Sequence, residues 1–438
     1  MRSREFVAFL ASISATTALG IDLILPAFGQ VRTAFGLAPD STSVALTVTT
    51  YFLGLSLAQV LYGPLSDRFG RKPVVMTGIA LYGAAAVVAG LAPSLPLLLT
   101  ARLVWGIGAA GPRVLMLAIA RDVYEGDRLA RVLSMAAALF MVVPALAPLL
   151  GQGLLAVVDW RGVFAAPSLL AAALLLWAWR RLDETLAPQD RRPLSLAGTR
   201  EAVQAVVRTR ISLGYALVQM FDFAAFASFL ATSELLFDRV YDRSSQFPAF
   251  FGAMSLLMGL VAFIGSRTVG RFGARRMILT LFCVNLVTVA ALFVVSIAGG
   301  GAPPFLAWFG LLTVSNSLRV VINPLAGSES MQPMGRLAGS AASVMGLIGM
   351  GGGSLLAGAT DRFIGDSVTP LSAAYLGYSI AGFVAVLYAN GIGRRSVADP
   401  LPQSTDVEPQ HAIQGHRADQ ADHDGAGRRP PPPDGDAE

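Results

Sequence analysis

The sequence predicts an all-α membrane protein whose roughly twelve spanning helices form two pseudo-symmetric halves. Of its 438 residues, 54% are hydrophobic and only 14% are charged, whereas a soluble domain has about 25% charged residues. The apolar residues gather in about twelve runs near the ~20 residues that cross a bilayer core. A loop motif, Arg68-Phe-Gly-Arg-Lys, recurs weakly as Arg271-Phe-Gly-Ala-Arg at the corresponding place in the second half. A soluble multi-domain enzyme is therefore excluded.

The apolar runs divide evenly between the halves. The first half contains Phe6–Leu25, Val44–Tyr62, Val74–Leu91, Leu95–Ala118, Val132–Leu155 and Val163–Trp179. The second half contains Ile211–Leu235, Phe247–Ile264, Ile278–Ala298, Pro304–Ile322, Leu337–Ala359 and Leu371–Leu387. The first run follows two arginines, as a signal peptide would, but no small-residue cleavage site stands out, so we expect a retained helix.

The charged connections predict the topology and the boundaries. Basic residues concentrate on the side of the N-terminus, so both termini are predicted to be cytoplasmic. We expect a first half at 1–180, a cytoplasmic linker at 181–210, a second half at 211–395 and a tail at 396–438. The tail has too little apolar surface to fold and is predicted to be disordered. It holds the chain's 3 histidines, which we expect to be solvated, with metal binding by His423 beside Asp422 and Asp424 as the alternative. The 1 cysteine lies in an apolar run, and no metal site is expected.

A short charged loop between the second and third runs carries the most specific motif. Its fixed positions are Gly63, Asp67, Arg68, Gly70, Arg71 and Lys72. Charges between two apolar runs predict a tight turn at the membrane surface. The pattern G-x-x-x-D-R-x-G-R-K resembles the loop between helices 2 and 3 of major facilitator superfamily transporters. The resemblance extends over roughly 6–387 and implies the major facilitator fold, with a substrate site near the midplane between the halves. Asp67 and Arg71 are expected to hold the cytoplasmic side closed.

Charged residues inside the runs are candidate functional residues, because each costs a few kcal/mol in the bilayer centre. Asp22 lies four residues before Pro26, in a segment that resembles the first helix of the Bcr/CflA drug-resistance branch. The alternative interpretation of Asp22 is a carboxylate at the membrane interface. In the fourth run, Arg102 with Gly106 resembles a superfamily motif whose arginine supports proton coupling. Arg113 follows about three turns later on the same face; its alternative is a snorkelling arginine.

Three further runs carry motifs or polar stripes. In the fifth run, Pro144, Pro148 and Gly151 resemble the antiporter motif of drug:proton exchangers, although an ordinary kinked helix could have the same residues. The seventh run places Asp222 near mid-depth, with Glu234 expected at the interface. The tenth run places Asn316, Arg319 and Asn323 on one face, which indicates a cavity-facing stripe or an arginine that joins two helices.

These residues predict a central cavity and the charge pairs within it. We expect the pairs Asp22–Arg113 and Asp222–Arg319, because an unpaired buried ion is costly. Asp22 and Asp222 are the candidate proton carriers, supported by Arg102. The expected cavity residues are Tyr51, Arg113, Met141, Phe221, Phe226, Asn316, Arg319 and Asn323. With two arginines near the centre, neutral or acidic lipophilic substrates are expected to be preferred over lipophilic cations.

The function predicted from the resemblance is drug:proton antiport by alternating access in a bacterial inner membrane. The chain is not expected to be an enzyme, since neither a G-x-x-x-x-G-K-[ST] phosphate loop nor a catalytic constellation is present. No cofactor is expected, since the proton gradient drives transport. The expected partners are a small-molecule substrate, protons and the lipid bilayer, without nucleic acid, and the chain is expected to be a monomer. An exporter of a specific metabolite, amino acid or sugar is the alternative, and a non-transporting receptor or scaffold is a third reading.

Overall fold

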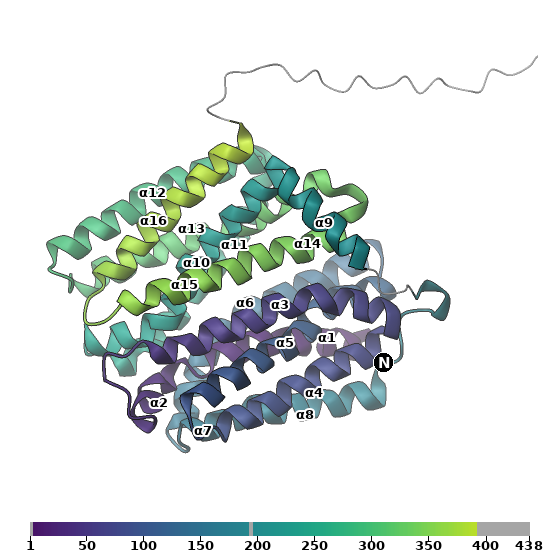
Figure 1. The fold of residues 1–438 in the computed structure, drawn as a ribbon, viewed down its shortest axis with the longest axis horizontal. Coiled ribbons are helices and arrows are strands. Elements are labelled where there is room, and N and C mark those ends of the chain that lie inside the picture. The colour runs from purple at the N-terminus through teal and green to yellow at the C-terminus, as the bar shows by residue number, and fades with distance from the viewer. Residues whose placement is uncertain (1–2, 192–195, 392–438) are drawn as a thin grey trace, which may run out of the picture. The chain divides into compact units, whose positions relative to one another are not determined.

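The chain folds into helices throughout the part that can be described. A computed structural model describes residues 3–191 and 196–391, and every regular element there is helical (Figure 1). Ten helical segments of this part are long and apolar enough to cross a membrane. One of them, Phe305–Phe363, contains two of the predicted runs, and the predicted run Val132–Leu155 has a shorter apolar helical part, Val142–Leu155. The prediction of an all-α membrane protein is confirmed.

The helices of the first half pack chiefly on one another. They are α1 (Ser3–Asp22), α2 (Phe28–Ala34), α3 (Leu46–Phe69), α4 (Arg71–Gly90), α5 (Leu95–Val123), α6 (Gly126–Leu155), α7 (Trp160–Val163) and α8 (Ala165–Arg181). α5 packs against α3 and α4, α4 against α8, and α1 against α6. The purple and blue ribbons of Figure 1 show this bundle, with the N-terminus at one end and α2 at the other. We call the end where α2 lies the far end.

The second half forms a corresponding set of helices. They are α9 (Leu196–Arg208), α10 (Arg210–Arg239), α11 (Phe247–Phe272), α12 (Ala274–Ala298), α13 (Phe305–Met331), α14 (Ala338–Gly346), α15 (Gly353–Thr360) and α16 (Thr369–Asn390). α10 packs against α13, α15 and α16, and α12 packs against α13 and α16. The halves meet where α6 contacts α11 and where α3 contacts α10, α14 and α15.

Glycines let α3 and α5 cross with their backbones in contact. A Cβ atom placed on Gly54 would lie 2.0 Å from the Leu103 carbonyl oxygen, and one on Gly106 would lie 2.0 Å from the Tyr51 carbonyl oxygen. No side chain fits at such a distance, so the crossing requires glycine on both helices. The predicted close approach at the glycines of the fourth run is thereby confirmed.

Three predicted segments differ from their structure. α1 ends at Asp22, and a 3-10 turn at Leu25–Ala27 leads into α2, because Pro26 cannot continue the backbone hydrogen bonding. The predicted run Leu337–Ala359 is not one α-helix: a π-helical segment at Leu347–Gly352 separates α14 from α15. The predicted linker 181–210 contains the helix α9, which belongs with the second half because it buries Ala202 and Val206 against the helices of that half. Residues 192–195 of that linker and the tail at 396–438 lie outside the described residues.

Candidate functional site

A cavity of about 540 Å³ lies between the two halves. Its wall comes from α1, α3, α5 and α6 of the first half and from α10, α11, α13 and the π-helical segment of the second. Four charged residues lie on this wall, Asp22, Arg113, Asp222 and Arg319, among mainly apolar neighbours. An apolar cavity with a few polar groups has the character of a small-molecule site.

Asp222 and Arg319 form a buried ion pair on the second-half side of the cavity. The Arg319 Nη1 atom donates to the Asp222 Oδ1 atom at 2.9 Å, and the Asn323 side chain donates to Oδ2 at 3.4 Å. Both charged side chains are nearly inaccessible, with 3% and 4% exposed. The predicted pair is confirmed, and its charges offset each other inside the apolar wall.

A hydrogen-bond network holds Arg319 in place. Its Nη2 atom donates to the Ser379 hydroxyl at 2.6 Å, and its Cζ atom lies 5.1 Å from the centre of the Tyr375 ring. The Tyr375 hydroxyl in turn donates to the Asn316 side-chain oxygen at 3.0 Å. Asn316, Arg319 and Asn323 all line the cavity. Tyr375 and Ser379 were not among the residues predicted from the sequence, although their i, i+4 spacing on α16 places them on one face.

Asp22 and Arg113 lie on the first-half side of the same cavity. Asp22, at the end of α1, is 5% exposed, whereas Arg113 of α5 is an exposed residue that lines the cavity. Asp22 thus lies in the cavity wall, and its depth relative to the membrane surface stays a prediction. The specific ion pair between Asp22 and Arg113 stays a prediction.

Arg102 lies behind the cavity wall rather than on it. It donates to the Gly20 carbonyl at 2.6 Å and to the Thr47 carbonyl at 3.1 Å, which ties α5 to α1 and α3. Its guanidinium carbon is 4.7 Å from the centre of the Tyr51 ring and 4.9 Å from that of Trp105. Its anchor on α1 is two residues before Asp22. The arginine is thus placed to fix the position of that carboxyl, while a role in proton coupling stays a prediction.

The aromatic part of the predicted wall needs correction. Tyr51 does not line the cavity: it is fully buried, and its hydroxyl donates to the Thr17 carbonyl at 3.2 Å. Phe221 does not line it either and instead lies beside Gly382 of α16, because it is one residue off the helix face of Asp222. Phe226 does line the cavity, as does Phe223, which the prediction omitted. The side chain of Met141 lies outside the described residues.

The three residues of the antiporter-like motif on α6 have different surroundings. Pro144 lines the cavity and Pro148 is buried. A Cβ atom on Gly151 would lie 2.1 Å from the Leu23 carbonyl oxygen, directly after Asp22. The motif therefore places the backbone of α6 against α1 beside the candidate proton carrier. Its function in antiport stays a prediction.

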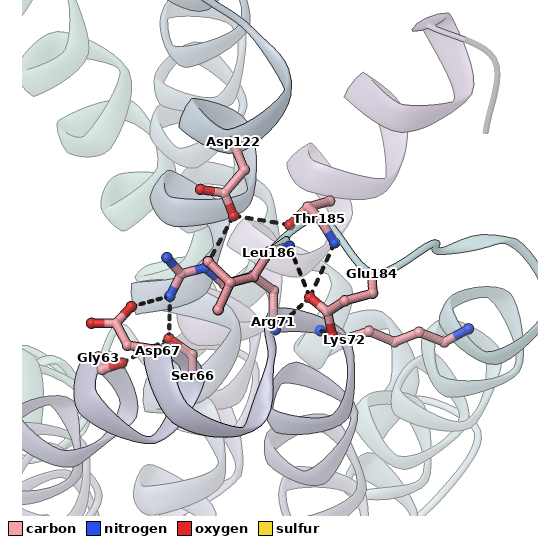
Figure 2. A network of polar contacts seen from close by, with 9 residues as sticks. All are labelled: Gly63, Ser66, Asp67, Arg71, Lys72, Asp122, Glu184, Thr185 and Leu186. Atoms are coloured by element: carbon pink, nitrogen blue, oxygen red, sulfur yellow. Dashed lines mark hydrogen bonds and ion pairs between the residues drawn. The ribbon is translucent and has the colours of Figure 1, made fainter. Parts of the chain in front are cut away.

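The charged loop between α3 and α4 forms a network on the side of the N-terminus (Figure 2). Arg71 binds the Asp67 carboxylate at 2.5 Å and the Asp122 carboxylate at 3.0 Å. Its backbone N–H and that of Lys72 donate to Glu184, at 2.8 and 3.3 Å. Gly70 adopts a φ of 102°, in the region that favours glycine, and a side chain there would collide with Glu184.

The remaining motif residues lie around this network. The Lys72 ammonium donates to the Trp179 carbonyl at 3.2 Å, and Arg68 lies over the Phe69 ring, while Gly63 has free space around its Cα atom. The network joins α3, α4 and the end of α5 to the segment after α8. These interactions join the first half to the start of the linker, and the predicted closing of the cytoplasmic side by Asp67 and Arg71 stays a prediction.

An ion pair at the far end joins the two halves. The Arg32 Nη2 atom of α2 donates to both carboxylate oxygens of Glu234 on α10, at 3.0 and 2.8 Å. Each side chain is only 6% exposed. Glu234 is thus buried between the halves, and its expected position near the membrane interface stays a prediction. The sequence signal was weak, because the two residues are far apart in the chain and neither lies in a recognisable motif.

Several known proteins are similar to this chain. A bicyclomycin resistance protein homolog of Haemophilus influenzae is 26% identical over 370 residues, which cover 84% of this chain and 91% of that protein. The multidrug resistance protein MdtL of Escherichia coli is 28% identical over 344 residues, covering 77% and 83%. Both similarities extend through most of the chain rather than over one motif.

Solved transporter structures have the same fold. The crystal structure of a D-xylose-proton symporter aligns with a TM-score of 0.71 at 13% identity, covering 88% of this chain and 97% of the symporter. The human organic anion transporter MFSD10 aligns with a TM-score of 0.62 at 20% identity, covering 89% and 100%. The family model of the Major Facilitator Superfamily matches residues 9–358. The chain therefore belongs to the Major Facilitator Superfamily, and it is a multi-pass membrane transporter, as the charged loop predicted, rather than an enzyme.

Proposed function

We propose that this transporter is a proton-coupled antiporter that exports lipophilic small molecules by alternating access. The observation that carries the proposal is the cavity between the halves, whose mainly apolar wall contains two buried carboxyls, Asp22 and Asp222, together with two arginines. A carboxyl can take up and release a proton as its surroundings change between dry and wet. Similarity to the bicyclomycin and multidrug resistance proteins supports export of drugs.

The substrates we propose are neutral or acidic rather than cationic. Arg113 is exposed in the cavity, whereas Asp22 and Asp222 are 5% and 4% exposed. A substrate therefore meets the positive group more directly than the negative ones. We further propose that the chain is a monomer in a bacterial inner membrane. We propose that both termini are cytoplasmic, because arginines gather on the connections at the side of the N-terminus.

The test is efflux from a bacterial host that lacks its own drug pumps. Cells that express the chain should survive bicyclomycin better than cells that express Asp222→Asn at an equal membrane level. A protonophore should abolish the difference, and proteoliposomes with an imposed pH gradient should accumulate bicyclomycin. Transport that continues undiminished without any proton gradient would contradict antiport.

A further inference from the structure

Asp361 is a buried acid that lies outside the cavity. It follows α15, at the start of the 3-10 turn Asp361–Phe363, and is 2% exposed. Neither of its carboxylate oxygens has a hydrogen-bond partner among the described residues, and neither is accessible to solvent. Asp361 is not among the residues that line the cavity between the halves.

Ser228 on α10 faces this carboxyl. Its side chain is fully buried, and its hydroxyl has no other hydrogen-bond partner among the described residues. The two polar groups, from different helices, therefore meet in a contact that excludes water. Buried polar groups are almost always paired, so a hydrogen bond between these two is expected, and a proton on the carboxyl would supply it.

The charged groups on the neighbouring helices are engaged elsewhere. On α10, Asp222 pairs with Arg319, Glu234 with Arg32, and Arg239 with Asp366. On α16, the Tyr378 hydroxyl is within electrostatic reach of the carboxyl but donates to the Leu356 carbonyl at 2.9 Å. Asp238 of α10 and Arg362, next to Asp361, form no ion pair with it among the described residues. No cation within the described residues offsets a negative charge on Asp361.

We propose that Asp361 and Ser228 form a second proton-binding site, in which the protonated Asp361 carboxyl donates a hydrogen bond to the Ser228 hydroxyl oxygen. An ionised carboxylate without a partner in an apolar interior is very costly in free energy. A bound proton removes the charge, and the resulting carboxyl O–H then needs only one oxygen atom as its hydrogen-bond acceptor. A sodium ion would need several oxygen ligands, and the described contact offers only two unpartnered side chains.

The position of the site connects it to the contact between the halves. Gly358, one turn before Asp361, packs against Thr49 of α3, where an added Cβ atom would lie 3.0 Å from the threonine methyl group. Asp361 itself faces α10 through Ser228, so its surroundings depend on both the α10–α15 and the α3–α15 contacts. The site is distinct from the proposed cavity carriers, and its test requires no transport.

Infrared spectroscopy of the purified full chain in lipid vesicles tests the proposal, in neutral potassium buffer without sodium. The carbonyl stretch of a protonated carboxyl should be present in the wild type and reduced in Asp361→Asn. The matched control is Asp366→Asn, which removes an exposed acid of the same connection, with 59% of its side chain exposed, and should leave the band unchanged.

Ser228→Ala keeps the carboxyl and removes its partner, so the band should shift to higher frequency, which provides a readout even if Asp361→Asn does not fold. An equal band in Asp361→Asn and wild type would overturn the proposal. So would an unshifted band in Ser228→Ala, or loss of the Asp361 band when sodium is added at constant pH, since the site would then bind a metal cation.

Discussion

Single residues set the charge of the cavity, and the Asp222–Arg319 pair is the most fully described of them. Both side chains are almost completely buried, and Ser379 and Asn323 complete their hydrogen bonds. Such a pair contributes little net stability, but removing one partner leaves an uncompensated buried charge. A change at Asp222 therefore affects both proton chemistry and folding.

Asp222→Asn should stop pH-driven efflux because the amide cannot carry a proton. It should also lower the free energy of unfolding by about 3–5 kcal/mol, since Arg319 is left unpaired. Efflux in proteoliposomes and thermal unfolding in detergent measure the two effects. The double variant Asp222→Asn, Arg319→Gln removes both charges and should recover most of the stability without efflux. Proton-driven accumulation by Asp222→Asn would show that Asp222 is not the carrier.

Asp22→Asn separates the second candidate carrier from the first. This carboxyl lies beside the Arg102 anchor on Gly20, so its position should survive the change while its proton chemistry does not. We expect loss of pH-driven efflux with retained substrate-for-substrate exchange in the same vesicles. If both neutral variants still concentrate substrate by using protons, neither acid is the carrier.

Helix contacts determine how accurately these residues are placed. α6 approaches the end of α1 so closely that a Cβ atom on Gly151 would lie 2.1 Å from the Leu23 carbonyl oxygen, whereas Gly153 has nothing within 4 Å. Small residues allow such contacts in membranes, where packing and hydrogen bonds hold helices together. The antiporter-like motif thus has a packing role whether or not it also has a role in coupling.

The two glycines of α6 make a matched comparison. Gly151→Ala should separate α6 from α1, lower the unfolding temperature and reduce efflux. Gly153→Ala, two residues away with the same added methyl group, should leave both unchanged. Thermal unfolding followed by size-exclusion chromatography measures the first effect. Equal stability of the two variants would mean that α1 can shift without cost.

Alternating access concerns the whole molecule, and the far end carries a contact suited to it. Arg32 of the first half and Glu234 of the second form an ion pair in which each side chain is 6% exposed. Opening the far end would break this pair and hydrate both charges. The pair therefore stabilises the arrangement in which the two halves are in contact at the far end. The cavity and the buried position of Asp361 belong to this same arrangement.

Charge reversal tests this contact. Arg32→Glu alone places two acids together and should favour the far-open arrangement, as should Glu234→Arg alone. The double reversal restores opposite charges and should recover transport to a substantial fraction of wild type. Accessibility of a single cysteine placed in the cavity, probed from each side in a Cys283→Ser background, reports the arrangement. If both single variants behave like the wild type, the Arg32–Glu234 pair has no role in the transport cycle.

Substrate selection is also a property of the whole cavity. We expect neutral or acidic lipophilic antibiotics to be exported better than quaternary ammonium dyes. Arg113→Gln should narrow that difference, because it removes the positive group exposed in the cavity. Resistance profiles in a pump-deleted host compare the two compound classes. Strong protection against ethidium-like cations, unchanged in Arg113→Gln, would contradict the expectation.

Properties that depend on local composition followed from the sequence by itself. Apolar length predicted the membrane-spanning helices, because in lipid every backbone group must find a partner within its own segment. The loop from Gly63 to Lys72 predicted the family through its motif alone. The spacing of Asn316, Arg319 and Asn323 predicted a shared face, since helical periodicity alone decides which residues point the same way.

Which residues meet across helices was decided only by the tertiary structure. Periodicity defines a face but not its neighbour, so Tyr51 and Phe221 were assigned to a cavity that they do not line. Arg32 and Glu234 meet from opposite halves. The buried position of Asp361 depends on how α15 ends against α10. Such long-range contacts depend on side-chain packing between segments distant in the chain, which no local pattern records.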